Sequence, residues 1–466
     1  MESRPATLGH LRDSGWRSVP VKEELRANAV ARIAAGRPLV SGVLGYDDTV
    51  LPQLETALLA GHDIIFLGER GQAKTRMIRS LTGLLDEWLP VVAGSEILDD
   101  PYHPVSRHAR DLVAAKGDDT PLEWVHRDAR FGEKLATPDT SIADLIGEVD
   151  PIRVAEGRYL SDEMTMHYGL VPRTNRGIFA VNELPDLAER IQVGLLNVLE
   201  ERDVQVRGYK IRLPLDIVLV ASANPEDYTN RGRIITPLKD RFGAQIRTHY
   251  PLDLETERAV VDQEARTWST LGLGVEVPDY MAEVVVTLSH LARQSPHVNQ
   301  RSGVSVRLSV ANHETLGASA LRRALRLGEG EAVARVSDLA ALASSSAGKI
   351  EIETVDEGRD GQVFDRLLAQ SVLSVFRARC PMEAMGEAIA SFDDGRVLHA
   401  GDDVASARFV DELAALPAMR PPVMALAGRE SPAAVAAATE FVLEGLHLSK
   451  RLNKDSAGSR ATYRSR

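Results

Sequence analysis

The sequence has few of the features that mark secreted or membrane proteins. It contains a single cysteine, Cys380, in 466 residues, which excludes an intrachain disulfide and favours a reducing compartment. No apolar run approaches the roughly 20 residues that a helix needs to cross a bilayer. Residues 1–22 carry several charges and have no apolar stretch of their own, so we expect no signal peptide. These absences together predict a cytoplasmic protein that does not span a membrane.

The sequence also lacks an excess of basic residues. Its formal net charge is −12, and its isoelectric point is about 5.6. A protein whose main task is to grip phosphate backbones usually has a net basic domain. A local basic surface can still exist on an acidic protein. The charge therefore disfavours nucleic acid as the main partner.

The pattern of apolar runs predicts an α/β domain over residues 39–251. Short apolar runs alternate there with amphipathic stretches, which is typical of a parallel sheet with crossover helices. Three runs, 62–67, 177–181 and 216–221, predict buried strands. Each run ends in a polar cluster, and open α/β sheets bind ligands at that edge.

The rest of the chain divides into four predicted segments. Residues 1–38 form an N-terminal helical arm, and 252–345 form a helical lid. Residues 346–449 form a mostly helical region with a proline break at Pro421-Pro422. The last stretch, 450–466, is basic and is predicted to be disordered. Within the lid, helices are predicted over 255–267, 278–294, 308–327 and 331–343.

A phosphate-binding pattern follows the first predicted strand. Residues 68–75 match the P-loop pattern G-x-x-x-x-G-K-S/T, except that Ala73 replaces the second glycine. We expect Ala73 to adopt helical dihedrals at the start of the next helix. In such loops the backbone N–H groups converge on an anion at a helix N-terminus. A strand-turn-helix with an incidental lysine is the plainer alternative.

This loop predicts bound ATP and Mg²⁺. The Lys74 ammonium would neutralise charge on the β- and γ-phosphates, and the Thr75 hydroxyl would face Mg²⁺. The predicted nucleotide-binding residues are Gly68, Glu69, Arg70, Gly71, Gln72, Ala73, Lys74 and Thr75.

The second predicted strand ends in a polar pair, Asn182 and Glu183. ATP hydrolysis needs a group that orients and deprotonates the attacking water, and Glu183 is the candidate base. An aspartate that holds Mg²⁺ usually occupies the place of Asn182. An amide oxygen can accept a hydrogen bond from a metal-bound water, but it contributes no negative charge. We therefore expect weak Mg²⁺ retention and slow turnover. The alternative is a strand that merely ends in a polar turn.

Three further residues complete the candidate site. Asn224, at the end of the third predicted strand, would help to position the attacking water. Arg241 would reach the γ-phosphate of a neighbouring subunit. Arg307 begins a long predicted helix, where its charge opposes the helix dipole, and this hints at an anionic partner. Taken singly, Asn224 could merely open a turn, and Arg241 could merely pair with Asp240.

With these elements in this order, the sequence resembles an AAA+ ATPase, and more narrowly the magnesium-chelatase I-subunit and MoxR-like branch. The resemblance covers roughly residues 40–345 and rests on the segments 169–185, 222–225 and 238–242. It implies a P-loop core with a helical lid. It assigns ATP and Mg²⁺ binding to Lys74 and Thr75, and water activation to Glu183. It also makes Asn224 the first sensor, Arg241 the finger and Arg307 the second sensor.

The resemblance implies an assembly as well as a site. It predicts a homo-oligomeric ring, expected to be a hexamer, and a partner with a von Willebrand A domain. An insert over 155–166 and a hairpin over 204–213 would project toward the ring's pore. Arg207, Tyr209, Lys210 and Arg212 are then candidate substrate contacts, and a solvated hairpin is the alternative.

The predicted function is an ATP-driven motor that remodels a partner protein or assists metal insertion. One alternative is a nucleotide-gated scaffold with little hydrolysis, because Asn182 departs from the family's aspartate. Another is a DNA-translocating ATPase, because an alanine before the P-loop lysine is also usual in the minichromosome-maintenance helicases. Enhancer-dependent transcription activators share a similar core, but their Gly-Ala-Phe-Thr-Gly-Ala loop is absent.

Overall fold

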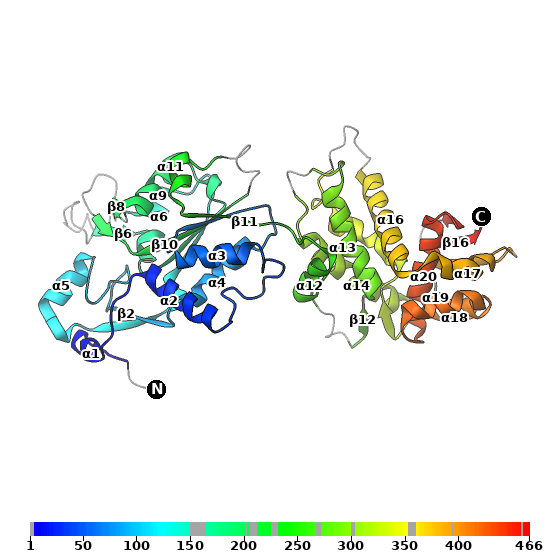
Figure 1. Cartoon of the computed structure of the whole chain (residues 1–466), viewed down its shortest axis with the longest axis horizontal. Helices are drawn as coiled ribbons and strands as arrows, with labels where there is room; N and C mark the ends of the chain where they lie inside the picture. The colour runs from blue at the N-terminus through cyan, green and yellow to red at the C-terminus, as the bar shows by residue number, and fades with distance from the viewer. Residues whose placement is uncertain are drawn as a thin grey trace. The chain divides into compact units, whose positions relative to one another are not determined.

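A computed structural model describes ten segments of the chain. These are residues 4–149, 165–201, 203–205, 212–224, 232–266, 272–299, 303–352, 360–393, 395–457 and 460–466. The chain divides into two compact units, Met1–His249 and Tyr250–Arg466, which we describe separately (Figure 1). Among the helices in the described segments, none combines the length and apolar character that a membrane span requires.

The first unit is built on a parallel five-stranded sheet. Its strands are β1 (Ile64–Leu67), β4 (Phe131–Leu135), β7 (Gly177–Asn182), β10 (Ile217–Ala223) and β11 (Ala244–Arg247), in the order β11-β1-β10-β7-β4. The three predicted strands are the three central ones. The predicted parallel α/β sheet is therefore confirmed, and β4 and β11 extend it on either side.

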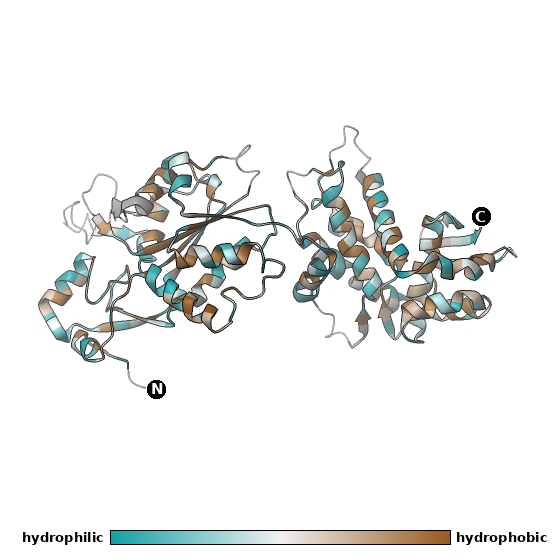
Figure 2. Ribbon diagram, in the orientation of Figure 1, coloured by the Kyte–Doolittle hydropathy of each residue, from teal (hydrophilic) through white to brown (hydrophobic). Residues whose placement is uncertain are grey.

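Helices cover both faces of this sheet (Figure 1). One face packs against α2 (Val21–Ala34), α3 (Val50–Leu59) and α4 (Lys74–Ser80), and the other packs against α9 (Glu189–Glu201) and α11 (Thr236–Arg241). Successive side chains in a strand point to opposite faces, so a strand covered on both sides is apolar throughout. The central strands are accordingly hydrophobic along their length (Figure 2).

The predicted N-terminal arm belongs to the core of the first unit. Helix α2 buries Val21, Leu25 and Ala29 in the cluster that covers one face of the sheet. The guanidinium of Arg130 lies 2.6 Å from the carboxylate of Glu24, and both side chains are buried. The arm is thus helical, as predicted, but it is packed into the α/β domain and does not stand ahead of it.

The remaining elements of the first unit are short. They are α1 (Leu8–Asp13), η1 (Leu81–Leu84), β2 (Trp88–Val92), α5 (Arg107–Lys116), η2 (Gly117–Asp119), β3 (Leu122–His126), η3 (Arg127–Arg130), α6 (Ile142–Leu145), β5 (Gly147–Val149), β6 (Met166–Tyr168), α8 (Leu170–Arg173), η5 (Leu184–Asp186), β8 (Asp203–Gln205) and β9 (Arg212–Pro214). Three antiparallel pairs, β2 with β3, β5 with β6, and β8 with β9, lie outside the central sheet.

The second unit is mostly helical. Its helices are α12 (Leu254–Glu264), α13 (Asp279–Gln294), α14 (Arg307–Leu327), η7 (Val336–Ala341), α15 (Leu342–Ser346), α16 (Asp360–Arg379), η8 (Met382–Met385), α17 (Gly386–Ala390), α18 (Ser406–Ala414), η9 (Pro417–Met419), α19 (Arg420–Ala427) and α20 (Pro432–Leu448). Its strands are β12 (Gly274–Glu276), β13 (Glu331–Val333), β14 (Val397–Gly401), β15 (Leu452–Ala457) and β16 (Arg460–Ser465). One apolar cluster joins α13, α14, α16 and α20, so the predicted lid and C-terminal region share a core.

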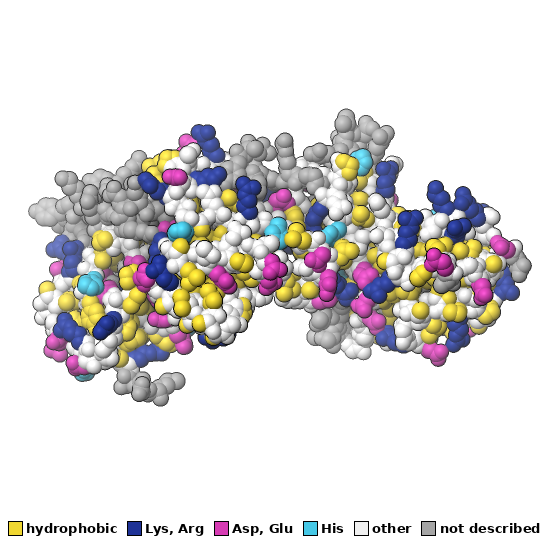
Figure 3. Space-filling model, in the orientation of Figure 1, with side chains coloured by type: hydrophobic (Ala, Val, Ile, Leu, Met, Phe, Trp, Pro, Cys, Tyr) yellow, Lys and Arg dark blue, Asp and Glu magenta, His cyan; other side chains and the backbone are white. Residues whose placement is uncertain are grey.

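The basic C-terminal stretch is ordered, which corrects the prediction of a disordered tail. Strands β15 and β16 form an antiparallel sheet with β14. Leu452 and Tyr463 are buried against the helical core, while basic side chains lie on the surface near the C-terminus (Figure 3). The Tyr463 hydroxyl also hydrogen-bonds Glu444 (2.5 Å). Two buried side chains and strand pairing outweigh a composition that is typical of frayed termini.

Two further predictions in the second unit are wrong in detail. The helix predicted over 331–343 is instead β13, η7 and the start of α15. Strand β13 pairs with β12, and the carboxylate of Asp338 accepts a hydrogen bond from the backbone N–H of Arg335 (2.9 Å), which starts the η7 turn. The Pro421-Pro422 pair lies in the first turn of α19 and does not break a helix. Proline is tolerated in a first helical turn because its missing N–H would have no intrahelical partner there.

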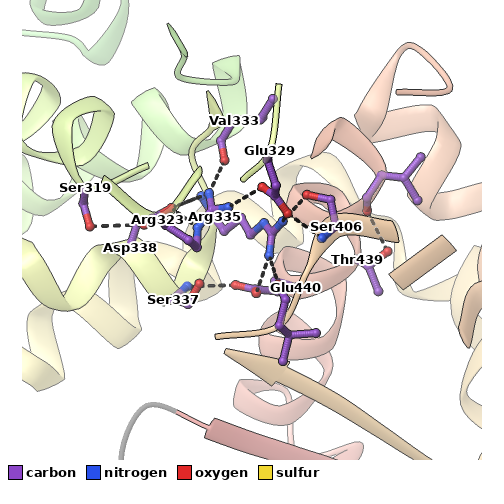
Figure 4. A network of polar contacts seen from close by, with 12 residues as sticks. Ser319, Arg323, Glu329, Val333, Arg335, Ser337, Asp338, Ser406, Thr439 and Glu440 are labelled. Carbon is purple, nitrogen blue, oxygen red and sulfur yellow. Dashed lines mark hydrogen bonds and ion pairs between the residues drawn. The ribbon is translucent and has the colours of Figure 1, made fainter. Parts of the chain in front are cut away.

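A buried network of charged residues links several elements of the second unit (Figure 4). Its members are Arg323, Glu329, Arg335, Asp338 and Glu440. The Arg323 guanidinium lies 3.0 Å from Asp338, but Arg335 and Glu440 approach only to 3.9 Å. Burial raises the pKa of Glu440 and lowers that of Arg335, in each case against the charge of the other residue. Glu440 connects the network to α20, and Ser406, which bonds to Arg335 and Glu329, connects it to the first residue of α18.

Candidate functional site

The phosphate-loop residues lie between β1 and α4, at the carboxyl edge of the central sheet. Lys74 begins α4 and is 7% exposed. Its ammonium donates hydrogen bonds to the Asn224 side-chain oxygen (2.7 Å), to the carbonyl of Glu69 (2.8 Å) and to the carbonyl of Gly68. Thr75 follows in the first turn of α4 and is partly exposed. The loop therefore presents an ammonium and a hydroxyl at a helix N-terminus, where the dipole favours an anion.

Two positions of this loop, Gly68 and Ala73, restrict which residue type fits the backbone. A Cβ atom at Gly68 would lie 1.9 Å from the Thr248 hydroxyl oxygen and 2.2 Å from the Gln72 side-chain oxygen, so only glycine fits. Ala73 has φ 55° and ψ 13°, in the left-handed region, and the expectation of helical dihedrals there is wrong. A left-handed conformation costs a non-glycine residue about 1–2 kcal/mol. Ala73 is the N-cap residue of α4, so this strain lies directly before Lys74.

A buried tyrosine, Tyr46, contacts the backbone of the phosphate loop. The Tyr46 hydroxyl contacts the carbonyl oxygens of Gln72 (3.0 Å) and His249 (2.7 Å). Burial raises the pKa of Tyr46 to about 12. The hydroxyl therefore stays protonated and able to donate. The Thr248 hydroxyl donates to the Gln72 side chain (2.6 Å), which holds the loop to the end of β11.

Lys74, Asn224 and Glu183 meet at the ends of three neighbouring strands. Asn224 accepts from Lys74 through its oxygen and donates through its amide nitrogen to the Glu183 carboxylate (2.6 Å). Lys74 follows β1, Glu183 follows β7 and Asn224 follows β10. Glu183 has φ 56°, another left-handed conformation that a side chain rarely adopts. Strained residues of this kind cluster at functional sites.

The polar contacts continue to the edge strand β4. The backbone N–H of Glu183 donates to the Ser222 hydroxyl (3.3 Å), which in turn donates to the Asn182 side-chain oxygen (3.2 Å). The Asn182 amide nitrogen donates to Glu133 (2.5 Å), and Glu133 also accepts two hydrogen bonds from Arg79 (2.8 and 3.2 Å). We call the whole series the polar chain: Lys74, Asn224, Glu183, Ser222, Asn182, Glu133 and Arg79.

Glu133 and Arg79 lie on the α4 side of the sheet. Phe131, two residues before Glu133, packs against the cluster that α4 covers. Hydrogen bonds from Arg79 to Glu133, together with their opposite charges, raise the pKa of the Arg79 guanidinium. Arg79 follows Thr75 by one helical turn, so both side chains lie on one face of α4.

The two arginines predicted to act in catalysis, Arg241 and Arg307, are not members of the polar chain. Arg241 is the last residue of α11 and is exposed. Arg307 is the first residue of α14, in the second unit, and is also exposed. Its helix has no side-chain cap, and its backbone N–H donates to the Ser305 hydroxyl (3.1 Å). The finger and sensor roles of these arginines stay predictions.

The predicted substrate-contact hairpin is described only at its base. Strands β8 and β9 pair in antiparallel register, with Gln205 opposite Arg212. Arg207, Tyr209 and Lys210 lie outside the described residues, and so does nearly all of the predicted insert over 155–166. The proposal that these residues contact a substrate stays untested.

A cavity of about 370 Å³ opens beside the phosphate loop. That volume lies within the range of small-molecule sites, which is about 300–1,000 Å³. Two basic residues, Lys239 and Arg247, are among those that line it, and the others are Leu67, Gly68, Glu69, Gln72 and Thr248. Cations at its wall and backbone of the phosphate loop suit an anionic ligand.

Sequence reasoning missed three residues that the structure brings to the site. Glu133 lies on a short edge strand with two charged residues in five, so it gave no signal of a buried strand. Tyr46 precedes α3 and Thr248 follows β11, and neither residue belongs to a recognised motif. The one available signal was the missing charge at Asn182, which could have prompted a search for another carboxylate.

Comparisons with known proteins find a partial match to one domain family and similarity to magnesium-chelatase subunits. A model of the Sigma-54 interaction domain matches residues 154–241, a stretch that contains Asn182, Glu183, Asn224 and Arg241. The magnesium-chelatase 38 kDa subunit of Cereibacter sphaeroides is 29% identical over 234 residues, which are 47% of this chain and 61% of that protein. The corresponding subunit of Rhodobacter capsulatus is 29% identical over 254 residues, 50% of this chain and 64% of that protein.

The matches leave parts of both chains uncovered. Subunit ChlI-1 of the Arabidopsis thaliana chloroplast enzyme is 29% identical over 209 residues, 44% of this chain and 46% of that protein. The aligned region thus spans less than two thirds of each of these relatives.

Solved structures with a similar course of the chain include NtrX from Brucella abortus and a model of the complex between the magnesium-chelatase subunits BchI and BchD. The NtrX structure has 12% identity and a TM-score of 0.40, and covers 74% of this chain and 66% of that chain. The chelatase complex has 22% identity and a TM-score of 0.35, and covers 70% of this chain and 99% of that chain. These structural likenesses are too weak to carry an inference.

Proposed function

Because the chain is homologous to the magnesium-chelatase I subunits, we propose that it binds ATP and hydrolyses it as an AAA+ ATPase. The observation that carries this proposal is the hydrogen-bonded series of Lys74, Asn224 and Glu183 at adjacent strand ends. A cation, an amide and a carboxylate are there held within reach of one ligand at a helix N-terminus. Phosphoryl transfer needs these groups, because catalysis of that reaction is mostly positioning and charge stabilisation.

Each residue has a separate task in the proposed reaction. Lys74 exchanges its bonds to the loop carbonyls for oxygens of the β- and γ-phosphates. Glu183 accepts a proton from the attacking water. Asn224, which contacts both residues, holds the Glu183 carboxylate toward that water. The strained backbone at Glu183 fixes the direction of its side chain, because a residue at the tip of β7 must turn sharply.

The oxygen donors near the loop fit Mg²⁺. This ion prefers carboxylate, hydroxyl and water oxygens in octahedral geometry. The Thr75 hydroxyl, the Asn182 amide oxygen and the Glu133 carboxylate are such donors. They lie in the first turn of α4, at the end of β7 and in the middle of β4. When bound, Mg²⁺ supplies positive charge that offsets the charge developing on the phosphates.

We further propose that the protein works as a homo-oligomeric ring, expected to be a hexamer. Arg241 is exposed at the end of α11, where it can serve the site of a neighbouring subunit. Arg307 then reports the nucleotide state to the helical unit. The proposed partner carries a von Willebrand A domain, and ATP use drives remodelling of that partner or metal insertion. Arg207, Tyr209, Lys210 and Arg212 are the proposed substrate contacts.

Nucleotide binding and steady-state phosphate release test the proposal. The wild type should bind a fluorescent ATP analogue and release phosphate above background when Mg²⁺ is present. Lys74→Ala should lose at least about tenfold in affinity, because a charge-assisted contact to phosphate contributes about 1.5–3 kcal/mol. Lys116→Ala, at an exposed lysine at the end of α5, is the matched control and should behave as the wild type. Equal affinity in both variants would refute the phosphate loop.

A second candidate function is a nucleotide-gated scaffold with little hydrolysis. It is favoured by Asn182, whose amide nitrogen donates to Glu133 and whose oxygen accepts from Ser222. The same phosphate-release assay separates the two functions. Tight ATP binding with turnover at background, at every Mg²⁺ concentration and ring concentration tried, would favour the scaffold.

A further inference from the structure

We propose that Glu133 supplies the negative charge that position 182 lacks, and that Mg²⁺-dependent nucleotide binding relies on this residue of the edge strand β4. The inference rests on the proposed function, because it concerns the metal that accompanies ATP. It assigns a role to a residue outside every motif of the phosphate site.

The geometry places one carboxylate against the end of β7. The Glu133 carboxylate lies 2.5 Å from the Asn182 amide nitrogen. Asn182 precedes Glu183 directly, and Ser222 joins the two through hydrogen bonds of 3.2 and 3.3 Å. Glu133 therefore belongs to the same hydrogen-bonded series as Lys74. Its side chain is 21% exposed, so a hydrated cation can approach it.

The pairing of Asn182 with Glu133 is chemically specific. An amide donates to a carboxylate, so the two side chains together hold one negative charge in a hydrogen bond. An aspartate at position 182 would bring a second carboxylate to hydrogen-bond distance of Glu133. Like charges that close cannot both ionise freely, and one of them binds a proton or a cation instead. Asparagine at position 182 is therefore compatible with an ionised Glu133 on the neighbouring strand, whereas aspartate is not.

Arg79 holds that carboxylate in place. It donates two hydrogen bonds to Glu133 from α4, one turn after Thr75. Its own side chain is 64% exposed, and exposed ion pairs contribute little to stability. A different reading is that Arg79 and Glu133 merely attach α4 to β4. If so, loss of either side chain would have the same effect on Mg²⁺-dependent binding. If Glu133 supplies the charge, only its loss weakens that binding.

The experiment compares nucleotide affinity with and without the metal. The affinity of a fluorescent ATP analogue is measured in Mg²⁺ and in EDTA, and the ratio of the two affinities is the metal enhancement. Glu133→Gln should lower this ratio by about 10–100-fold, the loss typical for residues that support a metal site. Arg79→Gln removes the same ion pair but keeps the carboxylate, so its ratio should equal or exceed that of the wild type.

A charge-swapped variant makes the test sharper. The double variant Asn182→Asp with Glu133→Gln restores one carboxylate and one amide, and it should recover the metal enhancement of the wild type. Glu123→Gln, at an exposed glutamate of β3, is the matched control for the loss of a charge and should leave the ratio unchanged. If Glu133→Gln does not fold in a thermal melt, the double variant alone decides.

The outcomes separate this inference from the proposed function. An unchanged ratio in Glu133→Gln, or an equal fall in Arg79→Gln, would overturn the role of Glu133 while ATP binding stands. A double variant that does not recover the ratio would also overturn it. Absence of nucleotide binding by the wild type, in Mg²⁺ and in EDTA alike, would instead refute the proposed function.

Discussion

The two units of this protein use charged side chains in opposite ways. The polar chain of the first unit follows the carboxyl edge of the sheet, and several of its members reach solvent. The buried network of the second unit lies inside the helical core, where Arg335 is fully buried and Glu440 is 2% exposed (Figure 4). Both join residues that are far apart in sequence.

The two sets of charged groups differ in whether a ligand can reach them. In the polar chain, Lys74, Asn224 and Glu183 bond to one another at 2.6–2.7 Å and still face an edge that a ligand can reach. In the buried network, Arg335 and Glu440 stay 3.9 Å apart, and one guanidinium nitrogen and one carboxylate oxygen have no hydrogen-bond partner among the described residues. Charges at the sheet edge are thus available for chemistry. Charges in the helical core instead specify how α14, β13 and η7 pack on α18 and α20.

The largest expected effect comes from breaking the polar chain at its carboxylate. Glu183→Gln keeps the size and hydrogen-bonding capacity of the side chain but removes the base. Turnover should fall on the order of 10²–10⁴-fold, the contribution typical of general base catalysis. Phosphate release measures this effect, and affinity for the ATP analogue should not change. Glu123→Gln is the control, and turnover that survives in Glu183→Gln would remove Glu183 as the base.

Breaking the buried network should affect folding and leave chemistry alone. Arg335→Met leaves the Glu440 carboxylate without its cation, which should lower the free energy of unfolding by about 3–5 kcal/mol. Adding Glu440→Gln removes the orphaned charge and should restore most of that loss. Denaturant unfolding followed by circular dichroism measures both changes. Arg366→Met, at an exposed arginine of α16, is the control, and an equal loss there would contradict the argument.

A third test uses pH to weaken a buried carboxylate cluster of the second unit. Burial by itself would raise the pKa of Glu257, but contacts from His290, Arg293 and Ser309 lower it to about 2 from its usual 4.5. Because this pKa is depressed on folding, the stabilisation is complete above about pH 4.5 and is lost as pH falls toward 2. The loss should be about 3 kcal/mol. Stability measured against pH should show this decline.

The matched variant for the pH test is Glu257→Gln. It cannot ionise, so its stability should be lower at neutral pH and should vary less between pH 4.5 and 2. The same slope in the variant and in the wild type would assign the acid sensitivity to other carboxylates.

The smallest expected effect concerns the strained phosphate loop. Ala73→Gly relieves the left-handed strain, but glycine adds freedom to the unfolded chain, so the net gain in stability should be at most about 1 kcal/mol. The control is Ala60→Gly, at the C-cap residue of α3, which has φ −78°. That change should lower stability by about 0.5–1 kcal/mol. Denaturation midpoints compare them, and a loss in both variants would mean that Ala73 is not strained.

Much of the candidate site could be predicted because its parts follow predictable strands. Strands β1, β7 and β10 are apolar on both faces, so they are visible as short continuous runs that end at polar residues. Parallel strands place their carboxyl ends at one edge, which brings Lys74, Glu183 and Asn224 together. The dihedrals of Ala73 could not be predicted in this way, because a residue's type limits its backbone but the surrounding loop selects the conformation.

The sequence by itself therefore determined the α/β core, the phosphate loop and the order of the polar strand ends. These depend on local spacing and on apolar patterns that are independent of distant segments. Only the tertiary structure decided that Glu133 faces Asn182, that Tyr46 supports Gln72, and that the basic C-terminal stretch forms a sheet. Each of these contacts joins segments that are distant in the sequence. No local pattern predicts them, because such contacts form only when the whole core packs.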